Sequence, residues 1–429
     1  MGVRPGYKQT EVGVVPVEWG LVPLEAIADR IMVGIASAAT HAYRDKGVPM
    51  FRNQNIKAGR LDDSDLLFIA PEYEATYKNK RLRAGDLLTM RTGYPGVTAV
   101  VPSQYESAQS FTTLITRPDP HQVDSTYLCH YINSEHGQRF FTQSQIGGAQ
   151  KNVNAGTLRR MPIPLPDIAE QRAIATALSD VNALLGGLDR LIAKKRDLKQ
   201  AAMQQLLAGQ TRLPGFHGEW EVKPLKHFVT RDRFAIVDGP FGSQLKVDEY
   251  VESGVPVIEM EHLSDGYIKE HIERCITPRK FEDLKRSAVY PGDIIISKTG
   301  SLGKLGLMPD CVERGLITSR LAKITLDPSS ADQRFVFQVL LKLRSDGYWE
   351  RVSQGGTMQI LGIGMLQNAP IPDIAVSEQA AIAAVLSDMD AEIEALKGRR
   401  AKTRDLKQAM MQELLTGQTR LVPVGAADA

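Results

Sequence analysis

Cysteine is scarce in this chain, and its spacing excludes two common uses. The 429 residues contain three cysteines, Cys129, Cys275 and Cys311, which lie far apart and form no CxxC pair. An odd and dispersed set argues against a disulfide framework and against a zinc site. The eight histidines add no pair at metal-ligand spacing. We therefore expect a reducing compartment and no metal site.

Long apolar runs and an excess of one charge are also missing. No segment approaches about 18 consecutive apolar residues, and the N-terminus has no apolar signal core. Basic residues number 52 and acidic residues 50, so bulk charge does not indicate nucleic-acid binding, although a local basic face is left open. We expect a soluble, cytoplasmic protein without membrane association.

Sequence motifs of catalytic sites are absent as well. The chain has no HExxH, no GxxxxGK[ST], no GxGxxG after a strand and no GxSxG. It also lacks the Asn/Asp-Pro-Pro-aromatic loop by which amino-methyltransferases hold a target nitrogen. We therefore expect no catalytic residues and no cofactor bound by this chain, and a binding role gains by elimination.

The chain contains an internal repeat. Residues 170–213 align without gaps on residues 378–421, with about 27 of 44 positions identical. Weaker echoes precede each copy: EWGLVPL at 18–24 answers EWEVKPL at 219–225, RAGDLLTMRTGYPG at 83–96 answers YPGDIIISKTGSLG at 290–303, and SQIGGAQ at 144–150 answers SQGGTMQ at 353–359. The order is therefore globular module, helix, globular module, helix.

Both repeated segments have the apolar spacing of a coiled-coil helix. Steps of three and four residues join Ile174, Leu178, Val181, Leu185, Leu188 and Ile192, and likewise Ile382, Leu386, Met389, Ile393 and Leu396. The stripes weaken near Lys195 and Arg400 and resume at Leu198, Ala202 and Leu206 and at Leu406, Met410 and Leu414. A cap at Asp167 and stops at Gly209 and Gly417 predict helices of about 42 residues, roughly 60 Å long.

Each apolar stripe needs a partner, and the other copy is the simplest one. We predict an antiparallel coiled coil with internal pseudo-two-fold symmetry between two mixed α+β modules. The predicted divisions are residues 1–160, 161–214 (helical), 215–368, 369–421 (helical) and a tail, 422–429. Short β-like runs are expected at 86–91, 97–101, 113–116, 255–260, 293–297 and 322–326, with helices at 126–142 and 332–352.

Two related modules held a fixed distance apart suit the reading of two separated DNA sites. A rod of roughly 60 Å spans about 18 base pairs, which leaves an unread gap between two short read segments. Exposed polar and basic loop residues read base edges. Candidates in the first module are Arg52, Asn53, Gln54, Asn55, Lys57, Lys80, Arg81, Arg91, Thr92, Tyr94, Gln150, Lys151 and Asn152, and in the second Lys298, Thr299, Ser301, Lys304, Gln354, Thr357 and Gln359.

One loop differs in charge between the two modules. Glu259 and Glu261 stand where the first module has Arg52 and Gln54. Two interpretations are open: the second module prefers a different base, for example by accepting a hydrogen bond from cytosine N4, or the loop is structural.

The motifs in combination resemble the specificity subunit of Type I restriction–modification systems. The resemblance covers nearly the whole chain: Glu18-Trp19 with Pro23-Leu24, the GD stretch ending in RTG or KTG at 85–93 and 292–300, the GGxQ-like loop, MPIP or APIP at 161–164 and 369–372, and EQ opening a long helix that ends in LLxGQTRL. It implies two target recognition domains that read a bipartite double-stranded DNA target, separated by two helical regions that set the spacing.

The resemblance also implies partners. The helices would dock two methyltransferase (modification) subunits, and the assembly would recruit restriction subunits. S-adenosylmethionine, ATP and magnesium would be used by those partners and not by this chain. Two alternatives are weighed against this: a coiled-coil adaptor whose globular ends bind proteins, and the recognition part of a single-chain restriction–methyltransferase, which is disfavoured because the sequence ends at Ala429 without a catalytic domain.

Overall fold

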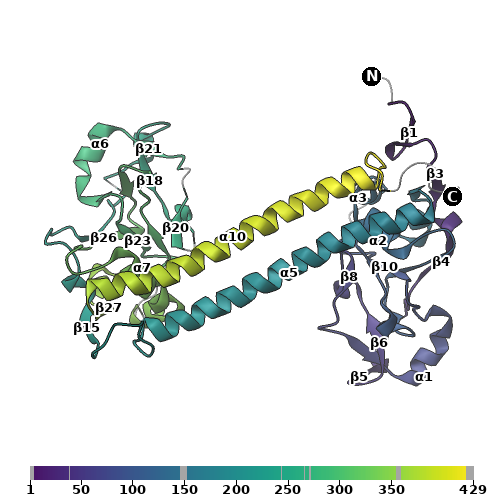
Figure 1. Ribbon diagram of the computed structural model, residues 1–429, viewed down its shortest axis with the longest axis horizontal. Coiled ribbons are helices and arrows are strands. Elements are labelled where there is room, and N and C mark those ends of the chain that lie inside the picture. Colours follow the sequence, from purple (N-terminus) through teal and green to yellow (C-terminus); the bar gives the residue numbers. More distant parts are fainter. Residues whose placement is uncertain are drawn as a thin grey trace. The chain divides into compact units, whose positions relative to one another are not determined.

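The long helices organise the structure, a computed structural model that describes residues 4–37, 39–144, 152–242, 244–264, 266–269, 272–353 and 359–421. There are two compact units, Met1–Asp189 with Gly398–Ala429, and Arg190–Lys397. Each unit holds one globular module and about half of each long helix, α5 (Ile168–Leu206) and α10 (Val376–Leu414), drawn in teal and yellow in Figure 1. The α+β class and the repeated module-then-helix order are confirmed.

Both helices have the capping residues that the sequence indicates. Each is 39 residues long, which corresponds to about 58 Å. Gly209 and Gly417 follow the helices with φ angles of 68° and 69°. These left-handed conformations, which glycine adopts without a Cβ clash, end the helices.

Within each unit the halves of α5 and α10 run antiparallel. In the second unit Lys195 Nζ lies 2.6 Å from a carboxylate oxygen of Glu392, and Lys199 Nζ lies 2.6 Å from one of Asp390. From Lys195 to Lys199 the residue number on α5 rises, while the number of the paired residue on α10 falls from 392 to 390. Pairs that change in opposite directions along two helices show that the helices run antiparallel. In the first unit Arg400 pairs with Asp189. Near the middle of both helices, where the apolar stripes weaken, ion pairs therefore join α5 to α10.

Two residues of the predicted stripe face outward. Leu198 is 47% exposed and Leu406 is 56% exposed, so their predicted place in the seam is wrong. A helix with 3.6 residues per turn drifts away from a strict seven-residue repeat. After Ile192 the contact line passes through Lys199 and Met203 instead, and Met203 is buried.

Two ion pairs, which we call the helix-end clamps, tie the end of each long helix to the start of the other. Arg212, just after α5, donates two hydrogen bonds of 2.6 and 2.7 Å to the buried carboxylate of Glu378 at the start of α10. Arg420, just after α10, makes the equivalent pair with Glu170 at the start of α5. The Glu170 carboxylate raises the pKa of Arg420 above its ordinary range.

The first module is built on two four-stranded sheets. One sheet is antiparallel, in the order β11 (Thr98–Val100), β10 (Leu87–Thr89), β13 (Leu114–Pro118), β4 (Ala28–Val33). The other has the order β12 (Gln109–Ser110), β6 (Val48–Phe51), β9 (Leu67–Ile69), β5 (Tyr43–Arg44) and is parallel only between β12 and β6. Hairpin β7 (Ile56–Lys57) and β8 (Arg60–Leu61) follows β6.

Alternation along the antiparallel sheet separates two cores. Leu87 and Leu114 pack with α2 (Ser125–Asn133) and the start of α5 in one core. Leu88 and Ile115, one residue further along each strand, pack with Phe51 in the other core. The second core lies beneath the loops that follow β6 and β10, so it fixes the surface described below.

The second module repeats this plan with more strands, in one six-stranded and one five-stranded sheet. One sheet has the order β16 (Ile236–Asp238), β26 (Leu321–Ile324), β23 (Ile294–Ser297), β24 (Leu305–Leu307), β20 (Gly266–Ile268), β19 (Leu263–Ser264). The other has the order β17 (Tyr250–Val251), β21 (Cys275–Ile276), β18 (Val255–Ile258), β25 (Gly315–Ile317), β22 (Ala288–Val289). The predicted strands at 86–91, 97–101, 113–116, 255–260, 293–297 and 322–326 are confirmed to within a few residues.

Each predicted helix beside the sheets is divided in two. Residues 126–142 form α2 and α3 (Glu135–Gln143), separated by Ser134, whose hydroxyl caps α3 by accepting from Gly137 N. Residues 332–352 form α7 (Gln333–Ser345) and α8 (Tyr348–Val352), separated by Gly347 with a φ of 68°.

The strand pairs at the helix starts account for two of the repeated motifs. In the first module β3 (Gly20–Pro23) pairs with β14 (Pro162–Leu165), which joins the GLVP and PIPL segments. In the second, β15 (Glu221–Pro224) pairs with β27 (Pro370–Asp373) in the same antiparallel way. The two motifs therefore form one short sheet in each unit, just before a long helix.

Candidate nucleic-acid interface

In the first module two loops from neighbouring sheets form one exposed surface. The 3-10 turn Asn53–Asn55 follows β6, and the RTGYPG loop, residues 91–96, follows β10. Between them lies a depression of about 620 Å³, called the first pocket, which is lined by Asn53, Gln54, Ile56, Lys57, Ala58, Met90, Thr92, Gly93, Tyr94 and Val97. The sequence candidates Asn53, Gln54, Lys57, Thr92 and Tyr94 are thus brought together.

Asn53 locks the two loops to each other. Its Oδ1 accepts a hydrogen bond of 3.1 Å from the backbone N of Arg91, and its Nδ2 donates one of 3.1 Å to Thr92 Oγ1. Tyr94 projects from these two loops and is 76% exposed. Gly96 ends the loop, and a Cβ there would lie 2.2 Å from the Phe141 ring, so only glycine is accommodated without movement.

Several predicted DNA-contact residues of the first module form hydrogen bonds within the module instead. Arg52 donates to Asp65, and Asn55, which is 2% exposed, donates to the backbone oxygens of Asp62 and Asp65. Gln54 also donates to Asp65, at 2.6 Å, but its side chain is exposed. These contacts shape the loop, so we attribute structural roles to Arg52 and Asn55.

Lys80 and Arg81 lie outside the lining of the first pocket. Lys80 Nζ donates to the backbone oxygen of Gly34, at 2.8 Å. Arg81 makes two hydrogen bonds of 2.7 Å to Glu74, and this guanidinium lowers the pKa of the Glu74 carboxyl. Arg91 is half-buried, Asn152 is exposed, and Gln150 and Lys151 lie outside the described residues.

The second module has an equivalent surface with a different lining. The 3-10 turn Met260–His262 follows β18, and the KTGSLG loop, residues 298–303, follows β23. They border a depression of about 520 Å³, called the second pocket, which is lined by Glu259, Met260, Glu261, Arg274, Ser301, Lys304, Thr318, Ser319 and Arg320. Ser301 and Lys304, two sequence candidates, are therefore part of it.

Lys298 is not an exposed contact residue. It is 8% exposed, and its Nζ lies 2.9 Å from Asp238 Oδ2. Its ammonium group is therefore held in an ion pair inside the module and is not exposed, and contact of Lys298 with DNA stays a prediction. Thr299 is half-buried, Gln359 is exposed, and Gln354 and Thr357 lie outside the described residues.

Sequence reasoning missed two arginines of the second pocket. Arg274 lies 3.1 Å from Glu259 and comes from the loop before β21, which has no repeated motif. Arg320 is exposed and lies between Thr318 and β26. A gapped alignment of FTTL at 111–114 with TSRLA at 318–322 would have shown Arg320 as an extra residue in the second copy.

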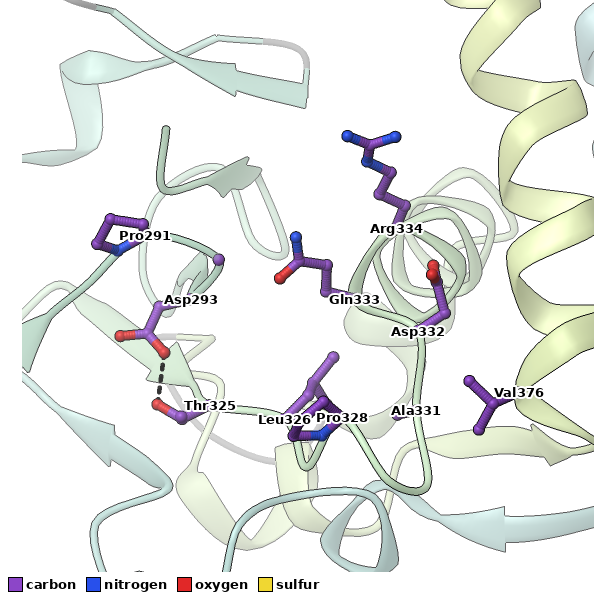
Figure 2. Close-up of a pocket in the computed structure, with 11 residues that line it drawn as sticks. Pro291, Asp293, Thr325, Leu326, Pro328, Ala331, Asp332, Gln333, Arg334 and Val376 are labelled. Atoms are coloured by element: carbon purple, nitrogen blue, oxygen red, sulfur yellow. Dashed lines mark hydrogen bonds between the residues drawn. The ribbon is translucent and has the colours of Figure 1, made fainter. Parts of the chain in front are cut away.

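Another depression of about 430 Å³ lies at the edge of the second module, lined by Asp293, Thr325, Asp332, Gln333, Arg334 and neighbours (Figure 2). Figure 2 shows Asp293 turned toward Thr325, whose Oγ1 donates to it at 2.6 Å. Burial raises the pKa of Asp293. Its counterpart Asp86 is held by Arg117 at 2.7 and 2.8 Å, so the same position supports the fold in both modules.

Other chemistry is not supported by the described part of the chain. Among those residues there is no group of three or more His, Cys, Asp or Glu side chains placed to hold a metal ion. No helix among them is both long and apolar enough to cross a membrane. The two exposed pockets therefore carry the argument for function.

Comparison with known proteins agrees with this arrangement. Residues 16–192 match the family described as the Type I restriction modification DNA specificity domain. A protein of Methanocaldococcus jannaschii named as the MjaX type I restriction enzyme specificity subunit is 25% identical over 97% of both chains.

Two solved structures share the fold. The S subunit of a Type-I restriction-modification system from M. genitalium has a TM-score of 0.60 at 15% identity, over 96% of this chain and 98% of that one. A chain solved in work on complex assembly and conformational transition of the type I R-M system has a TM-score of 0.58 at 20% identity, over 94% and 99%.

Proposed function

We propose that this chain is a specificity subunit of a Type I restriction–modification system and gives that system its DNA sequence specificity. Each module would read one part of a bipartite target. The observation that carries this proposal is the repetition of one surface: in both modules the turn after β6 or β18 meets the loop after β10 or β23 around an exposed pocket.

The pockets have the groups that duplex recognition needs. Lys57 is exposed at the first pocket, and Lys304 and Arg320 border the second. Amides and charged groups read base edges in the major groove, and basic groups contact phosphates. The net charge of +2 hides these local groups, because acidic residues elsewhere balance them.

The helices would set the spacing between the two read segments. Each is 39 residues long, so about 58 Å of helix accompanies each module and corresponds to about 17 base pairs of duplex. The antiparallel pairing through Lys195–Glu392 and Lys199–Asp390 stiffens the helices in the second unit, and Arg400–Asp189 does so in the first.

The outer face of the helices would dock two methyltransferase subunits. Leu198 and Leu406 occupy the same position of the two helix copies, 208 residues apart, and both are exposed. Large apolar side chains left exposed on a helix mark interaction surfaces when they form a patch. Leu191, one heptad before Leu198, is 39% exposed and extends the patch on α5.

Catalysis would belong to the partner subunits. In this proposal the chain acts in the cytoplasm and binds none of S-adenosylmethionine, ATP or magnesium itself, while methyltransferase and restriction subunits use them. The chain supplies the target address, and the restriction subunits join through the assembly.

The experiment is co-expression of the full chain with a modification subunit of its system in a methylation-free host, followed by genome-wide mapping of methylated adenines. We expect one new motif of two short blocks separated by a fixed number of unread bases. Lys57→Ala should weaken binding of the purified complex to all sequences and lower the salt slope by about one. Lys46→Ala, at an exposed lysine on the turn before β6, is the matched control. Copurification without any motif would refute DNA specificity.

A further inference from the structure

The two equivalent pockets differ in chemistry in a way that assigns them different base pairs. The floor of the first pocket is apolar: Ile56 is 2% exposed and Met90 7% exposed, and Val97 completes it. Its rim carries the amides of Asn53 and Gln54. No carboxylate lines this pocket among the residues that the structure describes.

The second pocket is charged where the first is apolar. Glu261 and Arg320 are both exposed on its wall, and neither has a salt bridge within the described ranges. Arg274 is held by Glu259 at 3.1 Å, so that pair is already neutralised. Among the residues that the structure describes, the charged groups of the wall without a salt bridge are the Glu261 carboxylate, the Arg320 guanidinium and the Lys304 ammonium.

We propose that the first pocket reads an A·T pair through the 5-methyl group of thymine and that the second reads a G·C pair. This inference rests on the proposed DNA-specificity function. In the first pocket Ile56 and Met90 contact the methyl group, while Oε1 of Gln54, whose amide nitrogen donates to Asp65, accepts a hydrogen bond from adenine N6. In the second, Arg320 donates to guanine O6 and N7, and Glu261 accepts from cytosine N4.

Each pocket also rejects the other pair. A cytosine amino group over Ile56 and Met90 would lose water and find no acceptor, which leaves a buried donor unpaired. In the second pocket a thymine methyl group would displace water from Glu261, and the adenine amino group would face the Arg320 guanidinium, donor against donor. Specificity thus arises from repulsion as well as attraction.

The test uses the full chain in complex with its modification subunits and duplexes carrying the motif found by methylation mapping. Deoxyuridine replaces each thymine in turn, which removes only the 5-methyl group. We expect one position in the block read by the first module to lose about fourfold in affinity, the effect of removing one buried methyl. Replacement of one guanine by 7-deazaguanine in the other block, which removes the N7 acceptor, should cost about tenfold.

Variants assign the blocks to modules. Arg320→Ala should relax one block and abolish its sensitivity to 7-deazaguanine, while sensitivity to deoxyuridine in the other block stays. Arg334→Ala, an exposed arginine of the same unit beside the unrelated depression of Figure 2, should change neither sensitivity.

Two outcomes would overturn the inference in different ways. A complex that binds all sequences equally would refute the proposed function together with the inference. A complex with a bipartite motif in which no thymine of the first block is methyl-sensitive, or in which Arg320→Ala leaves the response to 7-deazaguanine unchanged, would refute the base assignment and leave the proposed function standing.

Discussion

The helix-end clamps allow a quantitative test of how the repeat is held together. In the second unit Glu378 is 3% exposed and receives both hydrogen bonds of the Arg212 guanidinium, at 2.6 and 2.7 Å. Arg212 also lies over the Trp220 ring, 5.4 Å from its centroid. The change Arg212→Ala would leave the Glu378 carboxylate buried without a cation.

Removing one partner of a buried ion pair costs about 3 to 5 kcal/mol. The side chain of Arg212 is 22% exposed, so water can partly replace it and we expect the lower figure, about 3 kcal/mol. That loss corresponds to roughly 150-fold faster hydrogen exchange at the start of α10, if exchange there follows unfolding of the second unit. Exchange in the first unit serves as the internal reference.

Two controls separate the clamp from general damage. Arg139→Ala breaks an exposed pair with Glu135, whose side chains are 58% and 56% exposed, and should change stability by less than about 0.5 kcal/mol. The double change Arg212→Ala with Glu378→Gln removes the stranded charge and should cost less than the sum of the two single changes. If Arg212→Ala behaves like Arg139→Ala, the clamp does not stabilise the second unit.

Two further predictions concern the buried His130 in α2 and the exposed Leu198 in α5. His130 Nε2 lies 3.4 Å from Ser179 Oγ, near Lys407 and Asp124, and burial lowers the pKa of His130 to about 4. Between about pH 6.5 and 4 the unfolded chain therefore binds more protons than the folded chain, so the free energy of unfolding decreases as the pH falls. Urea unfolding should show a loss of about 3 kcal/mol across this window, which His130→Gln removes; an unchanged pH profile in that variant would count against it. Leu198→Lys should abolish copurification with the modification subunit without lowering the melting temperature, whereas Leu198→Met should keep both; association that survives the lysine would place the docking surface elsewhere.

The long helices could be predicted from the sequence because their signals are local. Asp167 caps the first helix by accepting from Glu170 N at 2.8 Å, and the glycines at 209 and 417 end the two helices within three residues of Leu206 and Leu414. The register between the two helices, in contrast, depends on contacts between residues far apart in the sequence. Leu198 satisfies the three-and-four spacing, yet Lys199 is the residue that faces Asp390 on the other helix.

The candidate site was predictable to the level of loops but not of side chains. Repeated motifs located the turn after β6 and the loop after β10, because both copies keep their glycines and their strand ends. Whether a basic residue in such a loop is exposed depends on a partner far away in the chain. Lys298 is neutralised by Asp238, 60 residues earlier, and Arg52 by Asp65, so the residue type alone gave no sign of either pair.

The two modules share a frame and differ at the pockets, and this division has a physical basis. Gly47 and Gly254 each precede the strand that leads to a pocket, and at either position a Cβ would lie 2.3 Å from a backbone oxygen, of Ile69 or of Ile276. The strand before each pocket is therefore fixed by backbone contact, independent of the pocket side chains. In the second module the extra residue Arg320 directly precedes β26. Its backbone oxygen still accepts a hydrogen bond of 2.8 Å from Lys298 N. A side chain can thus be added to the pocket wall while the backbone hydrogen bonds beneath it are kept. Each helix-end clamp joins residues at the ends of the long helices, and none of these residues lines a pocket. A change of base preference therefore need not disturb the clamps.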